Sequence, residues 1–292
     1  MKSLYRQNPA AVCVYFLCVL LPVMFGIDPV TAGTGLAAGL VLLFLLDPGL
    51  KPRGVWIYLL IPLFSMAVNP VFNHNGVTVL FFLNRNPVTR EALLYGLVLG
   101  LVISAALVWS RCFTAVMDTD RLLYVTGRLS PKVSLVLSMA LRYIPLCRRQ
   151  AARIREARRA VGLTREDNAV DRLRSALSVF SGLVTWTLEN GIVTADSMEA
   201  RGYGSGRRSR YSLFPWTRGD TLLSALSAAL FAAVLAARAA GKIGYVWYPV
   251  LVTPEAGPGG IAGYLAFCAL CLTGIILEIK ERRKWRSLRS EI

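Results

Sequence analysis

Six long apolar stretches constrain the fold of this chain more than any other feature of its sequence. A helix needs about 20 predominantly apolar residues to cross a bilayer, and each stretch comes close to that length. They cover residues 10–27, 30–46, 54–68, 92–110, 221–237 and 261–277. The third is short, and only Asp28 and Pro29 separate the first from the second. The pattern predicts an all-α membrane protein with about six transmembrane helices.

Composition excludes a freely soluble single-domain enzyme. Charged residues make up 17% of the chain and hydrophobic residues 55%, whereas an ordinary soluble domain is about 25% charged. Lys2 and Arg6 precede the first apolar stretch in the manner of a secretory signal peptide. Since no small-x-small cleavage site follows, we expect an uncleaved first helix.

The placement of basic residues predicts the orientation in the cell membrane. With the N-terminus inside, residues 1–9, 47–53, 111–220 and 278–292 face the cytoplasm and carry 29 of the 33 Lys and Arg residues. Cytoplasmic segments are expected to hold this excess, so both termini are predicted to be cytoplasmic. The resulting organisation is four transmembrane helices in 1–110, a cytoplasmic part in 111–219, and two transmembrane helices with a basic tail in 220–292.

Residues 111–219 hold 19 basic and nine acidic side chains, and a segment this long has structure of its own. A short helix is predicted over about 118–125, ending at Gly127. Ser130 and Pro131 form a helix start, and the helix that follows is predicted to run to Ala160. A third is predicted from about Asp167 to Gly202. We expect the two long helices to cross at the cytoplasmic membrane surface.

The third of these helices carries an apolar stripe that recurs every three or four residues, as expected of a helix face that packs against a partner. Its members are Ala169, Leu173, Leu177, Phe180, Val184, Leu188, Ile192, Ala195 and Met198. We expect this stripe to pack where the two long helices cross.

Both long helices end in a small residue, one further residue and a glycine. The two ends are Ala160-Val161-Gly162 and Ala200-Arg201-Gly202. One reading is structural, because glycine commonly caps a helix and arginine complements its C-terminal dipole. The other is functional, because an exposed guanidinium offers a planar fork to a carboxylate of a partner protein.

Several motifs resemble the transmembrane T component of energy-coupling factor (ECF) type ABC importers, a cobalt transport permease-like family. Between the third and fourth stretches the similar segments are 69–78 (Asn-Pro-Val-Phe-Asn-His-Asn-Gly-Val-Thr), 80–83 and 87–92. The first long helix contributes Ser130-Pro131, 142–145 (Arg-Tyr-Ile-Pro) and 154–162 (Ile-Arg-Glu-Ala-Arg-Arg-Ala-Val-Gly). The second contributes 197–204 (Ser-Met-Glu-Ala-Arg-Gly-Tyr-Gly). The similarity runs in order along nearly the whole chain.

The resemblance implies a non-catalytic coupling subunit of an importer for a vitamin or another micronutrient such as a metal. In that family each helix end carries Ala-Arg-Gly and engages one of two ABC-type ATPase subunits, while a separate S component binds the substrate. It implies that the ATPase subunits bind ATP and Mg and that this chain binds no cofactor. By resemblance the contacts are Ala200, Arg201 and Gly202 at one end and Ala160, Val161 and Gly162 at the other.

The first of these two motifs departs from the family pattern, because Val161 stands where the family usually has arginine. Arg158 and Arg159, one turn earlier, are the candidates to supply the missing charge. The sequence therefore supports the second ATPase contact more directly than the first.

Two other function classes fit the sequence less well. A self-contained secondary transporter needs ionisable groups at mid-membrane, and the six stretches hold none away from their ends. A basic insert also suits lipid or nucleic acid; we expect contact with membrane lipid but no nucleic acid, because aromatic residues do not alternate with the arginines.

Three smaller motifs point to no other chemistry. The chain has no G-x-x-x-x-G-K-[ST] motif with which to bind nucleotide phosphates. Cys268 and Cys271 form an isolated C-x-x-C in an apolar stretch, which favours packing over a metal site. A polar cluster of His74 with Asn69, Asn73 and Asn75 is expected to stabilise its own loop, and the alternative is that it lines a substrate entrance.

Overall fold

The computed structural model describes residues 3–47, 52–73, 76–83, 86–163, 168–206, 214–248, 251–253 and 257–290. His74 and Asn75 of the predicted polar loop lie outside these residues. The chain divides into two compact units. The first comprises Met1–Leu122 and Phe214–Ile292, and the second comprises Leu123–Leu213.

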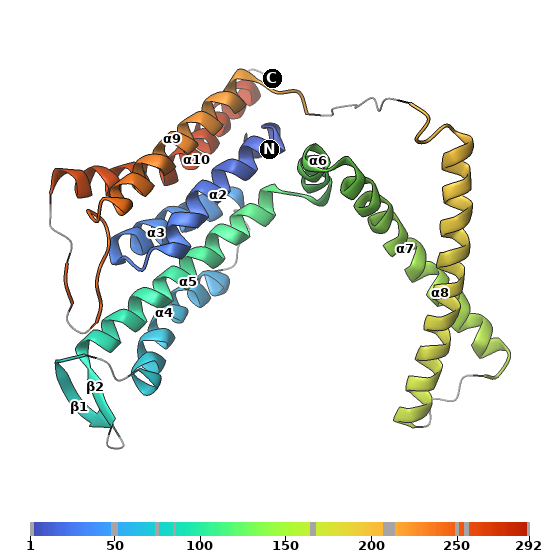
Figure 1. Ribbon diagram of the computed structural model, residues 1–292, viewed down its shortest axis with the longest axis horizontal. Coiled ribbons are helices and arrows are strands. Elements are labelled where there is room, and N and C mark those ends of the chain that lie inside the picture. Colours follow the sequence, from blue (N-terminus) through green and yellow to red (C-terminus); the bar gives the residue numbers. More distant parts are fainter. Residues whose placement is uncertain are drawn as a thin grey trace. The chain divides into compact units, whose positions relative to one another are not determined.

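Five of the six predicted apolar stretches fall within helices of the first unit, and the first, 10–27, runs two residues past the end of its helix (Figure 1). After the short α1 (Ser3–Arg6), these helices are α2 (Pro9–Phe25), α3 (Pro29–Leu46), α4 (Pro52–Phe72), α5 (Arg90–Val116), α9 (Arg218–Ala239) and α10 (Pro258–Ser290). Five of them are long and apolar enough to cross a membrane, and α2 is a shorter apolar helix of 17 residues. The prediction of an all-α membrane protein is confirmed.

Helix α5 packs against α2, α3 and α4 and carries the largest residue of the core. The indole of Trp109 is fully buried, and its N–H donates to the carbonyl of Gly35 on α3 at 2.9 Å. The rings of Tyr15 and Phe16 on α2 meet it edge-on, with centroid distances of 6.3 and 6.1 Å. These contacts join three helices in one core.

Helix α4 contains Pro62, as the apolar stretch 54–68 did, but it is longer than that stretch because it continues through Pro70 to Phe72. Two glycines of α5 allow the close approach. A Cβ on Gly100 would lie 2.5 Å from the Cα of Pro62, and one on Gly96 would lie 2.6 Å from the Cβ of Asn69. Backbone contact with α5 therefore supports α4 where prolines weaken its own hydrogen bonds.

A short hairpin precedes α5 and was not anticipated from the sequence. Strands β1 (Val79–Leu83) and β2 (Asn86–Thr89) pair antiparallel, with Val79 opposite Thr89. Thr89 then caps α5 by accepting from the backbone N–H of Ala92 at 3.3 Å. The amide of Asn69 donates to the carbonyl of the same Ala92 at 2.6 Å, which ties α4 to this helix start.

In the part of the second unit that the structure describes, the chain forms helices and short turns. Helix α6 (Thr119–Leu129) begins in the first unit and passes Gly127, where the sequence predicted its end. Helix α7 (Pro131–Ala160) has the predicted bounds, and α8 (Ala169–Ala200) starts two residues later than predicted. The two long helices cross each other (Figure 1).

Candidate functional site

Helices α7 and α8 cross antiparallel, with polar groups along the contact. The hydroxyl of Tyr143 lies 3.1 Å from that of Thr194 and donates to the carbonyl of Asn190 at 3.3 Å. Further along, the guanidinium of Arg158 donates to the hydroxyl of Ser178. Between these points a Cβ on Gly182 would lie only 3.5 Å from Ile154. Hydrogen bonds at both ends and a glycine between them thus define the crossing.

The apolar stripe of α8 does not pack into this crossing, so that expectation is wrong. Six of its members are more than two fifths exposed: Leu173, Leu177, Phe180, Val184, Leu188 and Ile192. Val179, which directly precedes Phe180, is the buried residue of α8, with 8% of its surface exposed. The helix pair turns a neighbouring, more polar face inward and leaves the stripe open.

The end of α7 is a complete Schellman motif, the common glycine-terminated helix end. Gly162 adopts φ +74°, and its N–H donates to the carbonyl of Arg159 at 3.0 Å. The N–H of Leu163 donates to the carbonyl of Arg158, also at 3.0 Å. Val161 occupies the C-cap position and is 72% exposed.

The end of α8 repeats this geometry. Gly202 adopts φ +80° and donates to the carbonyl of Glu199 at 2.8 Å, while Tyr203 donates to the carbonyl of Met198 at 3.0 Å. Arg201 occupies the C-cap position and is exposed. Val161 and Arg201 are therefore equivalent positions of two equivalent helix ends.

Glycine-terminated ends of this kind are not limited to the second unit. Helix α9 ends in Ala239-Ala240-Gly241, where Gly241 adopts φ +68° and donates to the carbonyl of Arg238 at 2.9 Å. The N–H of Lys242 completes the motif by donating to the carbonyl of Ala237 at 3.1 Å. The small-x-Gly pattern alone therefore identifies a helix end, and any coupling role depends on the surroundings of that end.

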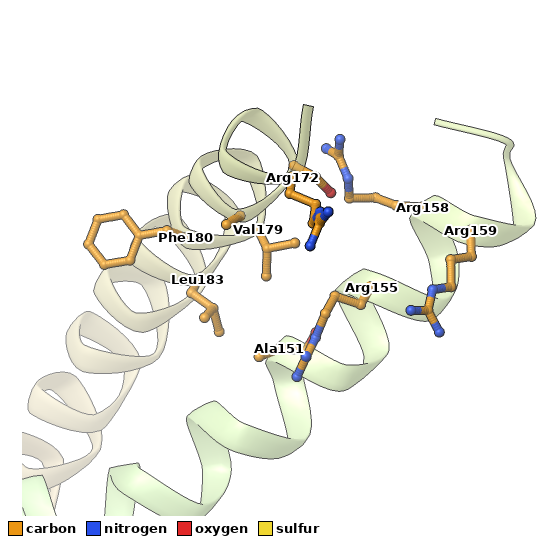
Figure 2. A pocket seen from close by; sticks show the side chains of 10 residues that line it. Ala151, Arg155, Arg158, Arg159, Arg172, Val179, Phe180 and Leu183 are labelled. Carbon is orange, nitrogen blue, oxygen red and sulfur yellow. The ribbon is translucent and has the colours of Figure 1, made fainter. Parts of the chain in front are cut away.

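An arginine-lined cavity lies beside the end of α7, between it and the first half of α8 (Figure 2). Its volume is about 410 Å³. Arg155, Arg158 and Arg159 line it from α7, and Arg172 lines it from α8. Val179, Phe180 and Leu183 supply apolar surface, and none of the ten lining residues is acidic. The site therefore combines strong positive charge with an apolar wall.

A second cavity, of about 450 Å³, lies beside the end of α8. Arg201 and Met198 line it from that end, and Arg142 and Tyr143 line it from α7. Each helix end therefore borders a cavity formed with the opposite helix, and both cavities contain guanidinium groups. The two helix ends therefore have similar surroundings. They differ in charge, because four arginines line the first cavity and two line the second.

Sequence patterns pointed to Arg158, Arg159 and Arg201 at these ends, and to Arg142 only as part of the 142–145 motif, while Arg172 was not identified. An antiparallel arrangement of the two helices would have identified Arg172, because it brings the start of α8 beside the end of α7. Elsewhere, no group of three or more His, Cys, Asp or Glu residues that could hold a metal occurs in the described part of the chain.

Comparison with known proteins gives one family and several relatives. The model of the family CbiQ, cobalt transport protein, matches residues 2–212. The energy-coupling factor transporter transmembrane protein EcfT of Streptococcus thermophilus is 27% identical over 241 residues, which cover 75% of this chain and 88% of that protein. EcfT 1 of Listeria monocytogenes is 26% identical over 202 residues, which cover 65% of this chain and 74% of that protein. With its apolar helix bundle and its crossed helix pair, this chain belongs to the CbiQ family of cobalt transport proteins.

Proposed function

We propose that this chain is the transmembrane coupling subunit of an ATP-driven ECF-type importer of a vitamin or another micronutrient. The observation that carries the proposal is the pair of matching helix ends, each beside its own guanidinium-lined cavity. Two similar docking sites suit two similar ATPase subunits. In this arrangement the ATPase subunits bind ATP and Mg, and this chain has no catalytic role of its own.

The end of α8 makes the more direct ATPase contact. Ala200 and Gly202 shape the end, and the side chain of Arg201 extends from the C-cap position, where its planar guanidinium can pair with a carboxylate of the docked subunit. The exposure of Arg201 in the isolated chain agrees with such a role. On docking, the pair becomes desolvated and strengthens.

The end of α7 uses a different source of charge. Ala160 and Gly162 keep the same helix end, but Val161 offers an apolar side chain where Arg201 offers a charged one. The arginines of the neighbouring cavity, Arg158 and Arg159 among them, replace the missing guanidinium (Figure 2). An acidic side chain of the first ATPase subunit enters that cavity, and Val161 packs beside it.

The exposed stripe of α8 is the contact for the S component, the small membrane protein that binds the substrate. Large apolar side chains in water are unfavourable, and a continuous row of them marks a surface for a protein or a membrane. Leu188 and Ile192 are 64% and 63% exposed in the isolated chain. ATP binding then moves the helix ends, and the crossed pair transmits that movement to the bound S component.

The orientation follows from the distribution of charge along the chain. The second unit lies on the cytoplasmic side, where ATP is available, together with both termini. This places 29 of the 33 basic residues inside, and ten of them lie in the short segments 1–9, 47–53 and 278–292, the kind of segment that the positive-inside rule counts.

Replacement of Arg201 tests the proposal. A cap or dipole contribution is worth about 0.3 to 1 kcal/mol, whereas truncation of a desolvated charge pair costs about 2 to 5 kcal/mol, or roughly thirty-fold or more in affinity. Arg201→Ala should therefore leave the chain inserted in the membrane but reduce the ATPase subunits that co-purify with it. Arg153→Ala, an exposed arginine of α7 outside both cavities, is the matched control. Equal ATPase recovery from the two variants would overturn the proposal.

A further inference from the structure

The chain leaves the first unit after Leu122 and returns to it at Phe214. One buried side chain of the first unit contacts both of these points. Arg121 directly precedes the exit, and its guanidinium carbon lies 5.8 Å from the centre of the Phe214 ring. The same guanidinium carbon lies 4.7 Å from the centre of the Tyr5 ring. The two covalent connections are therefore held side by side within the first unit.

Arg121 is 1% exposed, and its hydrogen bonds go to backbone carbonyls rather than to a carboxylate. It donates to Val116, the last residue of α5, at 2.9 Å. It also donates to Tyr5 at 2.8 Å and to Gln7 at 2.6 Å, at the end of α1. Carbonyls at helix C-termini have no partner within the helix and carry partial negative charge. One guanidinium thus satisfies the ends of two helices.

A second polar pair continues this network to α9. The side chain of Asn8 donates to the carbonyl of Phe214 at 3.1 Å, and its backbone N–H donates to the carboxylate of Asp220 at 2.8 Å. The same carboxylate accepts from the N–H of Thr217 at 2.8 Å and so completes the capping box of α9. Asn8 and Asp220 are 2% and 1% exposed. Both connections are thereby fixed to the starts of α2 and α9.

Burial of a charged guanidinium costs free energy of folding, which argues that the rigidity of this network has a role in function. Burial lowers the pKa of the Arg121 guanidinium from its ordinary value, yet arginine stays protonated in proteins, so a full charge remains inside. Its Nε–H finds no hydrogen-bond partner among the described residues. An apolar residue would fill the space without that charge, but it would leave several carbonyls of two helix ends unsatisfied.

We infer that Arg121 is a positioning residue that holds the departure of the chain at Leu122 and its return at Phe214 together within the first unit, so that movement of α7 and α8 reaches the membrane helices through two fixed points. This inference rests on the proposed function, since a rigid attachment affects transport only if those helices transmit movement. It assigns Arg121 a role distinct from that of the helix ends, which bind the ATPase subunits.

The test compares three variants in the complete complex reconstituted in liposomes. Arg121→Met removes the donors and the charge, and Phe214→Leu removes the ring over the guanidinium with little change in size. Arg111→Met makes the first substitution at an exposed arginine of α5 and is the control. Uptake is measured with the labelled compound that the wild-type strain accumulates from a panel of cobalt and B vitamins. ATPase recovery and ATP hydrolysis are measured on the same samples.

We expect ATPase recovery within twofold of wild type for all three variants. For Arg121→Met and Phe214→Leu, uptake per inserted complex should fall at least fivefold, and the ATP hydrolysed per molecule accumulated should rise at least fivefold. Loss of insertion by Arg121→Met leaves Phe214→Leu to decide the question. An unchanged ratio of hydrolysis to uptake in the variants that insert would overturn the inference, because a purely structural role lowers both activities together. Loss of ATPase recovery in Arg201→Ala, measured in parallel, supports the proposed function independently of that result.

Discussion

The hydroxyl of Tyr143 on α7 lies 3.1 Å from the hydroxyl of Thr194 on α8, and this is a direct polar link between the two crossed helices. Thr194 also bonds to the carbonyl of Asn190 in its own helix at 2.6 Å, and Tyr143 donates to that same carbonyl. Three groups on two helices therefore share one small network, which holds the crossing near the cavity that Arg201 borders.

Removal of the Tyr143 hydroxyl should loosen the crossing. A neutral hydrogen bond contributes about 1 kcal/mol net, so Tyr143→Phe should accelerate hydrogen exchange of the α7 and α8 amides about fivefold near the contact. Thr194→Val should have a similar effect, and the double variant should cost less than the sum because the two groups act together. Thr185→Val, whose hydroxyl bonds only within α8 to Ser181, is the control. Additive effects would show that the two hydroxyls act separately.

The arginine-lined cavity should contribute to ATPase binding independently of Arg201. Replacement of Arg155 and Arg172 by alanine removes two guanidiniums that face it from opposite helices. A charge-assisted hydrogen bond is worth about 1.5 to 3 kcal/mol, so the double variant should release the ATPase subunits at lower salt than wild type. Val161→Arg restores the family motif at this end and should be neutral or raise the salt needed for release. A salt profile unchanged by the double variant would exclude the cavity as a contact.

The part of the exposed stripe around Leu188 and Ile192 should bind a membrane partner and not the ATPase subunits. Leu188→Asp places a charge among exposed apolar side chains, so α8 itself should tolerate the change. Binding of an apolar surface over that carboxylate is costly because the charge loses its water. The protein that carries the substrate should therefore be lost from purified complexes while the ATPase subunits remain. Val170→Asp, equally exposed in the first turn of α8, should retain both. Retention of the full complex by Leu188→Asp would show that the stripe is not this contact.

Thiol labelling tests the orientation. With all six cysteines replaced, single cysteines at Val77 and Pro258 should react with an impermeant maleimide added to intact cells, since both side chains are exposed in loops or at a helix start. A cysteine at Glu156, exposed on α7, should react only after the cells are opened. Labelling of position 156 in intact cells would place the coupling unit away from cytoplasmic ATP and refute the model.

Local signals in the sequence predicted the helices well. Pro131 at the first helical position and the glycines at 162 and 202 mark the bounds of the two long helices within two residues. The predicted stretch 54–68 stopped short of Pro70, whereas α4 continues to Phe72, and glycines of α5 allow close packing along it. The hairpin was missed since its strands are only five and four residues long.

The faces of the helices were harder to assign than their bounds. Apolar periodicity reports which side of α8 avoids water, but not which molecule covers it, so Leu177 and Phe180 were placed in a contact that Ser178 and Gly182 make instead. The role of Arg121 could not be predicted from the sequence, because its acceptors are backbone carbonyls and every residue carries one. Only the folded chain distinguishes it from the exposed arginines around it.

The attachment of the second unit at one place has a consequence for how such proteins diversify. Because Arg121 and Phe214 are neighbours in the first unit, the 91 residues from Leu123 to Leu213 form an insertion whose two ends start from adjacent points. An insertion of this kind can be exchanged as a single block without altering the geometry of the host fold. Preference for particular ATPase subunits and for the S component, which both contact this block in the proposed function, would then be inherited together when the block is exchanged.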